Sequence, residues 1–292
     1  MTTYALIGAA GYIAPRHMQA IKETGGTLVA AMDPNDSVGV LDRYFPQAQF
    51  FVEFERFERY IEKLRQDDRP IDYLVVCSPN YLHDSHSRYG LRAGLNVICE
   101  KPLALNPWNV DPLKVIQKAT DRRVFSILQL RLHPAIQQLK DTVRANDNNR
   151  TYQVDLNYVV PRGAWYQTSW KGDISKSGGI ITNIGIHFFD VLLWIFGPCL
   201  TSHVSRCTNH MATGTLRLQH AQVTWHLSIK TDNGKWQSTR RMTVDHEELD
   251  FTAGFEQLHT MSYRRILGGN GYSIADALPA VALVSDLRAQ MG

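Results

Sequence analysis

Cysteine is scarce in this chain of 292 residues, which holds only four. None of the four belongs to a CxxC pair and most lie in apolar runs, so we expect buried free thiols rather than a disulfide framework. They are Cys77, Cys99, Cys199 and Cys207. No internal repeat or low-complexity segment is visible either, which argues against a repeat architecture.

The chain also has no large excess of charge of one sign, because it contains 31 basic and 28 acidic residues and its net charge is +3. Without a concentrated basic tract, nucleic acid is not expected as the main partner, whereas a small anionic substrate fits. No apolar run is expected to reach the length of a membrane span, since DVLLWIFG is bounded by Asp190 and Pro198. Met1 leads into the strand-like YALIGAAG without a basic leader, so we expect a cytoplasmic protein with no membrane partner.

The first part of the chain alternates short apolar runs with amphipathic helical patterns, as parallel strands joined by helices do. The runs YALIGA, TLVAAMD, YLVVCSP and LNVICEKP are rich in apolar residues and end in polar residues, Gly or Pro, which is typical of strands buried on both faces. Helices are expected over about 14–24, 54–66, 83–93 and 109–120. The pattern predicts an α/β fold in which residues 1–123 form a doubly wound parallel sheet of the Rossmann type.

The pattern changes beyond Arg150, where TYQVDLNYVV and the segments 215–230 and 238–251 alternate like antiparallel strands. ITNIGIHFFDVLLWIF and the closing ADALPAVALVSDLRAQ have helical spacing. We therefore expect residues 124–292 to form an α+β domain on a mostly antiparallel sheet, with roles in substrate binding and oligomerisation.

A glycine turn follows the first expected strand, at Gly8-Ala9-Ala10-Gly11-Tyr12-Ile13. In this position a tight turn brings backbone N–H groups close to the diphosphate of a dinucleotide. The match to GxGxxG is imperfect, because Ala10 and Ile13 occupy the second and third glycine positions and Gly11 is displaced by one. The turn alone therefore leaves a non-binding loop open as the alternative.

Asp33 strengthens the prediction of a cofactor, since it ends the second expected strand 25 residues after Gly8. An acidic side chain there can accept hydrogen bonds from the ribose hydroxyls of adenosine. The 2′-phosphate of NADP would be repelled by this carboxylate, and the following Pro34 and Asn35 supply no Arg to hold it. We therefore predict NAD rather than NADP as the cofactor.

Two more strand ends carry polar residues, in SPNYLH from Ser78 and in Glu100-Lys101-Pro102. Together with the glycine turn and the later SGGIITNIGIHFFD, they resemble the glucose-fructose oxidoreductase, inositol dehydrogenase and MocA (Gfo/Idh/MocA) family over nearly the whole chain. The resemblance implies an oxidoreductase with an NAD-binding domain and a second domain on a large sheet. It also implies a set of cofactor-binding residues, namely Gly8, Gly11, Tyr12, Ile13, Asp33, Ser78, Asn80, His83, Glu100 and Lys101.

The same resemblance implies that Lys101 contacts the reacting hydroxyl and that His187 is the base. An ammonium lowers the pKa of a hydroxyl, and an imidazole takes up its proton near neutral pH. The family usually carries Asp four residues before this histidine, whereas this chain has Asn183, which lies on the same helix face and completes the catalytic set. Asp190 is expected to support the helix. We expect no metal site, since neither His187 with Asp190 nor His83 with His86 supplies three ligands.

Several strings place the chain near one branch of that family. GAAGYIAPRHMQAIKETG, SPNYLHDSH, RGAWYQTSWKGDISKSGG and GFEQLHTMSY resemble the bacterial UDP-N-acetylglucosaminuronate 3-dehydrogenases of O-antigen (lipopolysaccharide) sugar biosynthesis. The third of these strings, from Arg162, is expected to be a long loop. Its aromatic side chains can stack on a sugar or uracil ring, and its basic side chains can bind carboxylate and diphosphate. The expected substrate-binding residues are Lys101, Arg162, Tyr166, Trp170, Lys171, Lys176, Ser177, Asn183 and His187, with Trp165 beside them.

Other functions stay open at this point. A polyol or inositol dehydrogenase of the same family is one, and a non-catalytic protein that senses NAD or a nucleotide sugar is another, because fold alone does not establish activity. The aromatic and basic loop could instead be a solvated surface or an oligomer contact. The resemblance further implies a homo-oligomer, as a dimer or a tetramer.

Overall fold

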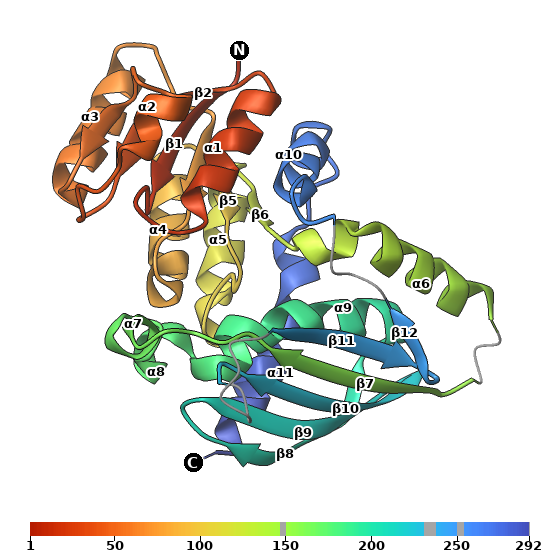
Figure 1. The fold of residues 1–292 in the computed structure, drawn as a ribbon. Helices are drawn as coiled ribbons and strands as arrows, with labels where there is room; N and C mark the ends of the chain where they lie inside the picture. Colours follow the sequence, from red (N-terminus) through yellow and green to blue (C-terminus); the bar gives the residue numbers. More distant parts are fainter. Residues whose placement is uncertain (147–149, 231–237, 250–253, 292) are drawn as a thin grey trace. The chain divides into compact units, whose positions relative to one another are not determined.

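The structure is a computed structural model, and it describes residues 1–146, 150–230, 238–249 and 254–291 (Figure 1). The chain divides into two compact units. The first comprises Met1–Ala104, Trp108–Ile127 and His259–Ala277, and the second comprises Leu105–Pro107, Leu128–Leu258 and Leu278–Gly292.

The first unit contains a six-stranded parallel sheet in the order β3-β2-β1-β4-β5-β6. Its strands are β1 (Thr3–Ile7), β2 (Thr27–Met32), β3 (Gln49–Phe51), β4 (Tyr73–Val76), β5 (Asn96–Cys99) and β6 (Val124–Ser126). Its helices are α1 (Ala14–Glu23), α2 (Val40–Tyr44), α3 (Phe54–Gln66), α4 (His83–Arg92), α5 (Asp111–Thr120) and α10 (Leu258–Leu267), with a short turn of helix at Asn80–Leu82. The doubly wound parallel sheet is confirmed.

This strand order fixes where a ligand can bind. Strand β1 lies between β2 and β4. The chain therefore extends the sheet first on one side of β1, through β2 and β3, and then on the other side, through β4, β5 and β6. A sheet of this order opens a crevice at the carboxyl ends of its central strands. The apolar sequence of β1 fits its central position in the sheet. A central strand is covered on both faces, and the side chains of Tyr4, Ala5, Leu6 and Ile7 are at most 1% exposed.

The segment 259–277 joins the first unit although it follows the second sheet in the sequence. The backbone N–H of Ser126 in β6 donates to the carbonyl of Tyr272 at 2.9 Å, and Tyr263 on α10 is fully buried in the apolar core. The sequence pattern expected the first domain to end at residue 123, whereas in the structure β6 also belongs to the first sheet.

The second unit contains a six-stranded mixed sheet in the order β12-β11-β7-β10-β9-β8. Its strands are β7 (Tyr152–Val159), β8 (Cys199–Cys207), β9 (Met211–Leu218), β10 (Ala221–Ser228), β11 (Thr239–Val244) and β12 (Glu247–Leu249). Among the described strands only β7 and β10 pair in parallel, so the expected mostly antiparallel sheet is confirmed. Buried and exposed residues alternate along most of β7, which explains the alternation in its sequence.

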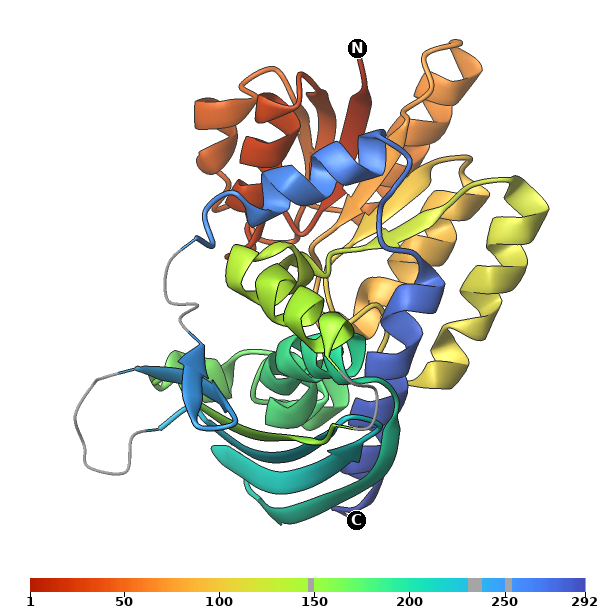
Figure 2. The same cartoon turned by 90° about the vertical axis from the view of Figure 1, so that its right-hand side faces the viewer.

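The second unit also contains several helices. They are α6 (Pro134–Ala145), α7 (Trp165–Thr168), α8 (Ile174–Ser177), α9 (Ile186–Phe196) and the main part of α11 (Ile274–Ala289), and a π-helix at Ile181–Gly185 leads into α9. Both views show α9 lying along the strands (Figure 1 and Figure 2), and the ring of Phe189 meets that of Trp225 in β10 at 5.4 Å between centroids.

The run Ile174–Phe196 is longer than the sequence pattern suggested, because α8, the π-helix and α9 follow one another almost without interruption. Its 23 residues satisfy the length and composition of a membrane span, so the expectation that no run reaches that length is wrong. In this structure 72% of its most apolar window is buried, as in the core helix of a folded domain.

Candidate active site

The glycine turn after β1 is shaped by close contact with the end of β4. Gly8 has φ +92°, and a Cβ added there would lie 2.5 Å from the carbonyl carbon and oxygen of Cys77 and 2.7 Å from the backbone nitrogen of Ser78. Those atoms are backbone and cannot move aside, so only glycine fits. The N–H of Gly11 donates to the carbonyl of Gly8 at 3.0 Å, which closes the turn just before α1 begins at Ala14.

Asp33 is held beside this turn. Its Oδ2 accepts a hydrogen bond from the N–H of Ala10 at 3.0 Å, and its Oδ1 accepts one from the N–H of Asn35 at 2.9 Å. The carboxylate is therefore fixed at the end of β2 and remains partly exposed. Of the other predicted cofactor residues in the turn, Tyr12 is 88% exposed and Ile13 packs partly against the apolar core.

The loop after β4 is tied to the loop after β5 by His83. The ring nitrogens of this buried histidine contact the carbonyl oxygens of Ser78, at 2.7 Å, and Pro102, at 2.6 Å. Burial lowers the pKa of His83, although both carbonyl contacts act to raise it. A neutral ring can donate only one of these two hydrogen bonds. Since both nitrogens are engaged, the structure shows His83 as a support of the two strand ends, and its contact with the cofactor stays a prediction.

Glu100, which follows β5, lies in a buried group of polar side chains. Its Oε1 is 3.0 Å from Nε2 of both His17 and His259, and its Oε2 accepts the backbone N–H of Lys101 at 3.1 Å. Lys101 itself is only partly buried. No pattern in the sequence indicated the two histidines, because they lie 83 and 159 residues away from Glu100.

In the second unit, Asn183 and His187 are placed by the π-helix and the start of α9. Both are partly exposed, whereas Ile184 and Ile186 beside them are buried. Asn183 Nδ2 donates to the hydroxyl of Tyr166 at 2.7 Å. A π-helix widens one turn and is frequent at functional sites, so its position here supports the prediction for these two residues.

Asp190, three residues after His187, is the partner of a buried cation. Its two oxygens accept hydrogen bonds from Nη2 of Arg131 at 2.6 Å and from Nε at 2.9 Å, with both side chains about 5–6% exposed. The expectation that Asp190 supports its helix rather than binding a ligand agrees with this contact. Sequence reasoning missed Arg131, which lies 59 residues away.

The loop before the π-helix gathers positive charge next to aromatic rings. The ammonium of Lys171 lies 4.4 Å from the ring centroid of Trp170 and 5.6 Å from that of Trp165. Burial lowers the pKa of Lys171, and the charge of Arg162 lowers it further. Two cations this close repel each other, so a bound anion would stabilise both.

The remaining predicted loop residues already have partners within the loop. Ser177 is fully buried, where its hydroxyl donates to the carbonyl of Asp173 at 2.9 Å and accepts from the N–H of Gly179 at 3.0 Å. Lys176 is exposed and pairs with the carboxylate of Asp173 at 3.5 Å. These contacts explain both residues without a substrate, so their predicted role gains no support from the structure.

Comparison with protein families decides the assignment that this geometry suggests. Residues 2–127 match the oxidoreductase family with an NAD-binding Rossmann fold, and residues 136–248 match the GFO/IDH/MocA C-terminal domain. The chain belongs to the Gfo/Idh/MocA oxidoreductase family.

Solved structures of this family include two that are similar along the whole chain. The WlbA (WbpB) dehydrogenase from Thermus thermophilus in complex with NAD and UDP-GlcNAcA has 46% sequence identity and a TM-score of 0.94, with 99% of this chain and 95% of that chain covered. Its complex with NAD and α-ketoglutarate gives the same identity and coverage with a TM-score of 0.95.

Curated members of the family are more distant. Glucose-6-phosphate 3-dehydrogenase of Bacillus subtilis is 24% identical over 202 residues, and inositol 2-dehydrogenase 2 of Saccharopolyspora erythraea is 28% identical over 175 residues. The matched residues are 67% and 58% of this chain, and 54% and 47% of those relatives. The chain thus spans about half the length of these two relatives.

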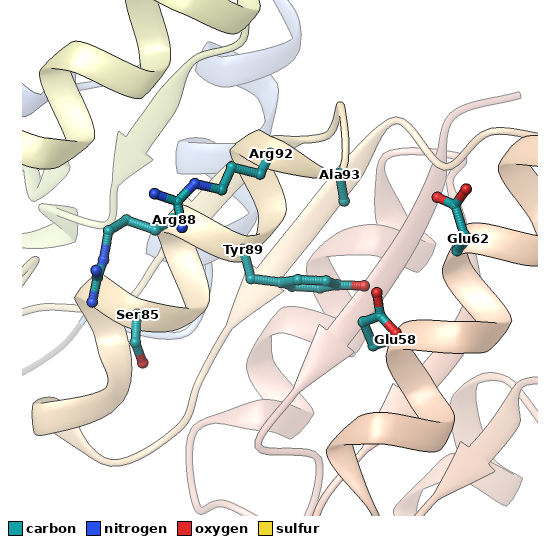
Figure 3. A pocket seen from close by; sticks show the side chains of 7 residues that line it. All are labelled: Glu58, Glu62, Ser85, Arg88, Tyr89, Arg92 and Ala93. Atoms are coloured by element: carbon teal, nitrogen blue, oxygen red, sulfur yellow. The ribbon is translucent and has the colours of Figure 1, made fainter.

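A surface pocket of about 420 Å³ between α3 and α4 stands apart from the predicted site residues, none of which lines it (Figure 3). The ring of Tyr89 extends from α4 toward Glu58 on α3, while Arg88 and Arg92 extend from α4 on the other side. Arg88 is paired with Asp84 of its own helix at 3.1 Å.

Proposed function

We propose that the chain catalyses the NAD-dependent oxidation of the C3 hydroxyl of UDP-N-acetylglucosaminuronate to the 3-keto sugar, in O-antigen biosynthesis. The observation that carries the proposal is the 46% identity over 99% of the chain to a dehydrogenase solved with NAD and UDP-GlcNAcA. Assembly into a homo-oligomer and a cytoplasmic location remain predictions.

The residues of the first unit fit NAD. Gly8 lets the turn lie against the end of β4, a glycine turn in this position brings backbone N–H groups close to a diphosphate, and Asp33 presents a fixed carboxylate to a ribose. When bound, NAD supplies the acceptor for the hydride of the substrate. The chain's own part is to hold the cofactor and to manage the proton of the reacting hydroxyl.

Lys101 and His187 are the residues that we assign to that proton. Oxidation of an alcohol carbon requires the hydroxyl proton to leave, and a nearby ammonium lowers the hydroxyl pKa while a neutral imidazole accepts the proton. We assign the first role to Lys101 and the second to His187. Asn183, bonded to Tyr166, lies on the same helical segment and carries no negative charge, which suits a substrate that itself bears a carboxylate.

We predict that the native protein binds NAD more tightly than NADP. The replacement Asp33→Asn should narrow this preference by about 10-fold or more, because an amide no longer repels the 2′-phosphate and donates where the carboxylate accepted. Dissociation constants measured by calorimetry for both cofactors test this, with Asp36→Asn as the control because Asp36 is also exposed and three residues away. Equal or tighter binding of NADP by the native protein would contradict the role of Asp33.

We also predict that the protein discriminates by the sugar carboxylate. UDP-N-acetylglucosaminuronate should bind about 10- to 150-fold more tightly than UDP-N-acetylglucosamine, since loss of a charge-assisted partner costs roughly 1.5–3 kcal/mol. Calorimetry with each nucleotide sugar in the presence of NAD measures the ratio. Lys171→Met should reduce it, because Lys171 lies with Arg162 in the basic loop, whereas Lys63→Met on the exposed face of α3 should not.

Comparable affinity for both sugars would show that the carboxylate is not recognised. If neither nucleotide sugar binds and a free polyol is oxidised instead, the chain is a polyol or inositol dehydrogenase. If NAD and a nucleotide sugar bind without any increase in NADH absorbance, the protein is a sensor and the proposed activity is wrong.

A further inference from the structure

We propose that His17, His259 and Tyr263 form a buried hydrogen-bond network that positions Lys101 through the carboxylate of Glu100. The network lies within the first unit. The proposal rests on the proposed function in one respect, namely that Lys101 serves the chemical step. Its three members are positioning residues, because their contacts are with Glu100 and with one another.

The network is a chain of short contacts between buried side chains. The Tyr263 hydroxyl is 2.9 Å from Nδ1 of His17, and Nε2 of His17 is 3.0 Å from Oε1 of Glu100. His259 reaches the same oxygen with its own Nε2 at 3.0 Å. Tyr263 and His17 are 0% exposed, and His259 and Glu100 are 4–5% exposed, so these contacts form away from water.

The contacts fix the position of each proton. Burial by itself raises the pKa of Glu100, but the hydrogen bonds from His17 and His259 outweigh it and hold that pKa well below the usual range. An ionised carboxylate only accepts, so both histidines must carry a proton on Nε2. Burial lowers the pKa of His17, which keeps the ring neutral and leaves Nδ1 to accept the proton of Tyr263.

His259 is also expected to carry its proton on Nε2, and a second observation supports this. Among the described residues, its Nδ1 has no hydrogen-bond partner. A proton on that atom would be buried without an acceptor, which costs free energy, whereas a proton on Nε2 has Glu100 as its acceptor. The two rings meet edge to face at 5.0 Å between centroids, an arrangement in which each supports the orientation of the other.

The network restrains the backbone at Lys101. The second oxygen of Glu100 accepts the backbone N–H of Lys101, and His83 contacts the carbonyl of the next residue, Pro102. The backbone is therefore held on both sides of the Lys101 Cα, which limits the directions in which the side chain leaves the chain. Positions that vary by about 1 Å can change turnover strongly, so such restraint matters for a group that acts on a hydroxyl.

A bound cation is the competing interpretation of the same atoms. His17, Glu100 and His259 offer three ligand atoms within 4.8 Å of one another. However, Glu100 Oε1 lies at hydrogen-bond distance from both Nε2 atoms, and Tyr263 completes the shell of His17, so the group is already paired without an ion. Measurement of the histidine protonation states separates the two interpretations.

The first experiment is independent of substrate. In the full chain labelled with ¹⁵N-histidine, we expect NMR to show a proton on Nε2 and none on Nδ1 in both His17 and His259, assigned by the loss of each signal in His17→Gln and His259→Gln. A ring protonated on Nδ1, a doubly protonated ring at pH 7, or a stoichiometric metal ion that is lost in His17→Gln would overturn the network. This result stands whether or not the protein oxidises the proposed substrate.

The second experiment measures the effect on Lys101. In His17→Leu we expect kcat to fall about 10-fold or more, while the NAD dissociation constant and the KM for the nucleotide sugar change less than about 3-fold. His17→Gln should restore much of kcat, because its amide can donate to Glu100. A merely structural role would lower binding and turnover together and would not be rescued by Gln. Unchanged kcat in His17→Leu would overturn the proposal.

A milder pair of variants covers the case in which His17→Leu does not fold. Tyr263→Phe removes only the hydroxyl that donates to His17, and Tyr4→Phe removes a second buried hydroxyl that lies outside the network although the two rings are 5.9 Å apart. We expect a kcat about 2- to 5-fold lower in Tyr263→Phe and no change in Tyr4→Phe, with both variants fully folded at the assay temperature. Equal kcat in the two variants contradicts the network. Absence of turnover in the native protein contradicts the proposed function instead.

Discussion

Lys101→Met and His187→Asn are each expected to lower kcat by about 100-fold or more, because each removes a positioned group that assists the departure of the hydroxyl proton. Neither change should alter NAD affinity much, since we assign the binding of the cofactor to the glycine turn and Asp33, which are held by contacts of their own. A loss in kcat without a matching rise in KM would indicate an interaction made only in the transition state.

Single-turnover absorbance of NADH measures this step without interference from product release. His226→Asn is the matched control for His187→Asn, because His226 is also a partly exposed histidine of the second unit. His226 lies on β10, and its Nδ1 is 3.0 Å from Oδ1 of Asn157 on β7. Lys63→Met is the control for Lys101→Met, because Lys63 is a lysine of the first unit that lies on the exposed face of α3. Near-native turnover in either active-site variant would remove that residue from the mechanism, and a folded variant that no longer binds NAD would assign it to the cofactor.

The elements of this protein follow from patterns that are local in the sequence. Apolar runs such as YALI and YLVV predicted strands buried on both faces, and the alternation in TYQVDLNYVV predicted a strand with one exposed face. The position of Gly8 is local in the same sense, since the turn directly follows the first strand, although the contact that requires glycine there is with the distant Cys77 and Ser78. Fold and cofactor class could therefore be predicted.

The supports of the candidate site could not, because they are contacts between residues far apart in the sequence. Arg131 meets Asp190, and His17 and His259 meet Glu100, across separations of 59 to 159 residues. No periodicity or motif encodes such pairs. The segment 259–277 was missed for the same reason, because its place in the first unit depends on pairing with β6.

The loop from Arg162 to Ser177 shows the limit of reasoning by residue type. Its three basic residues, Tyr166, Trp170 and Ser177 were predicted as substrate contacts, but Ser177 is buried in a local turn and Lys176 is paired with Asp173. Only the arrangement in space distinguishes Lys171, which lies against two indole rings and close to another cation, from the residues that complete the loop's own structure.

Asp190→Asn is expected to lower the free energy of unfolding of the second unit by about 3–5 kcal/mol. The change leaves the guanidinium of Arg131 buried without a counter-charge, and breaking a buried ion pair from one side is strongly destabilising. The double variant Arg131→Met/Asp190→Leu should regain most of the loss, since apolar replacement of both partners removes the uncompensated charge. Asp245→Asn is the control, because the side chains of the Arg150–Asp245 pair are 51% and 30% exposed, so the pair should contribute much less.

Urea unfolding followed by tryptophan fluorescence reports on this unit, because Trp194 lies 5.6 Å from the Arg131 guanidinium and Trp225 is buried under α9. If Asp190→Asn and Asp245→Asn shift the midpoint equally, the buried pair contributes no more than the exposed one and the expectation is wrong. Since α9 carries both Asp190 and His187, the double variant also separates two effects of the pair. Restored stability with low kcat would show that the Arg131–Asp190 pair orients His187, and restored stability with native kcat would confine the pair to holding the fold.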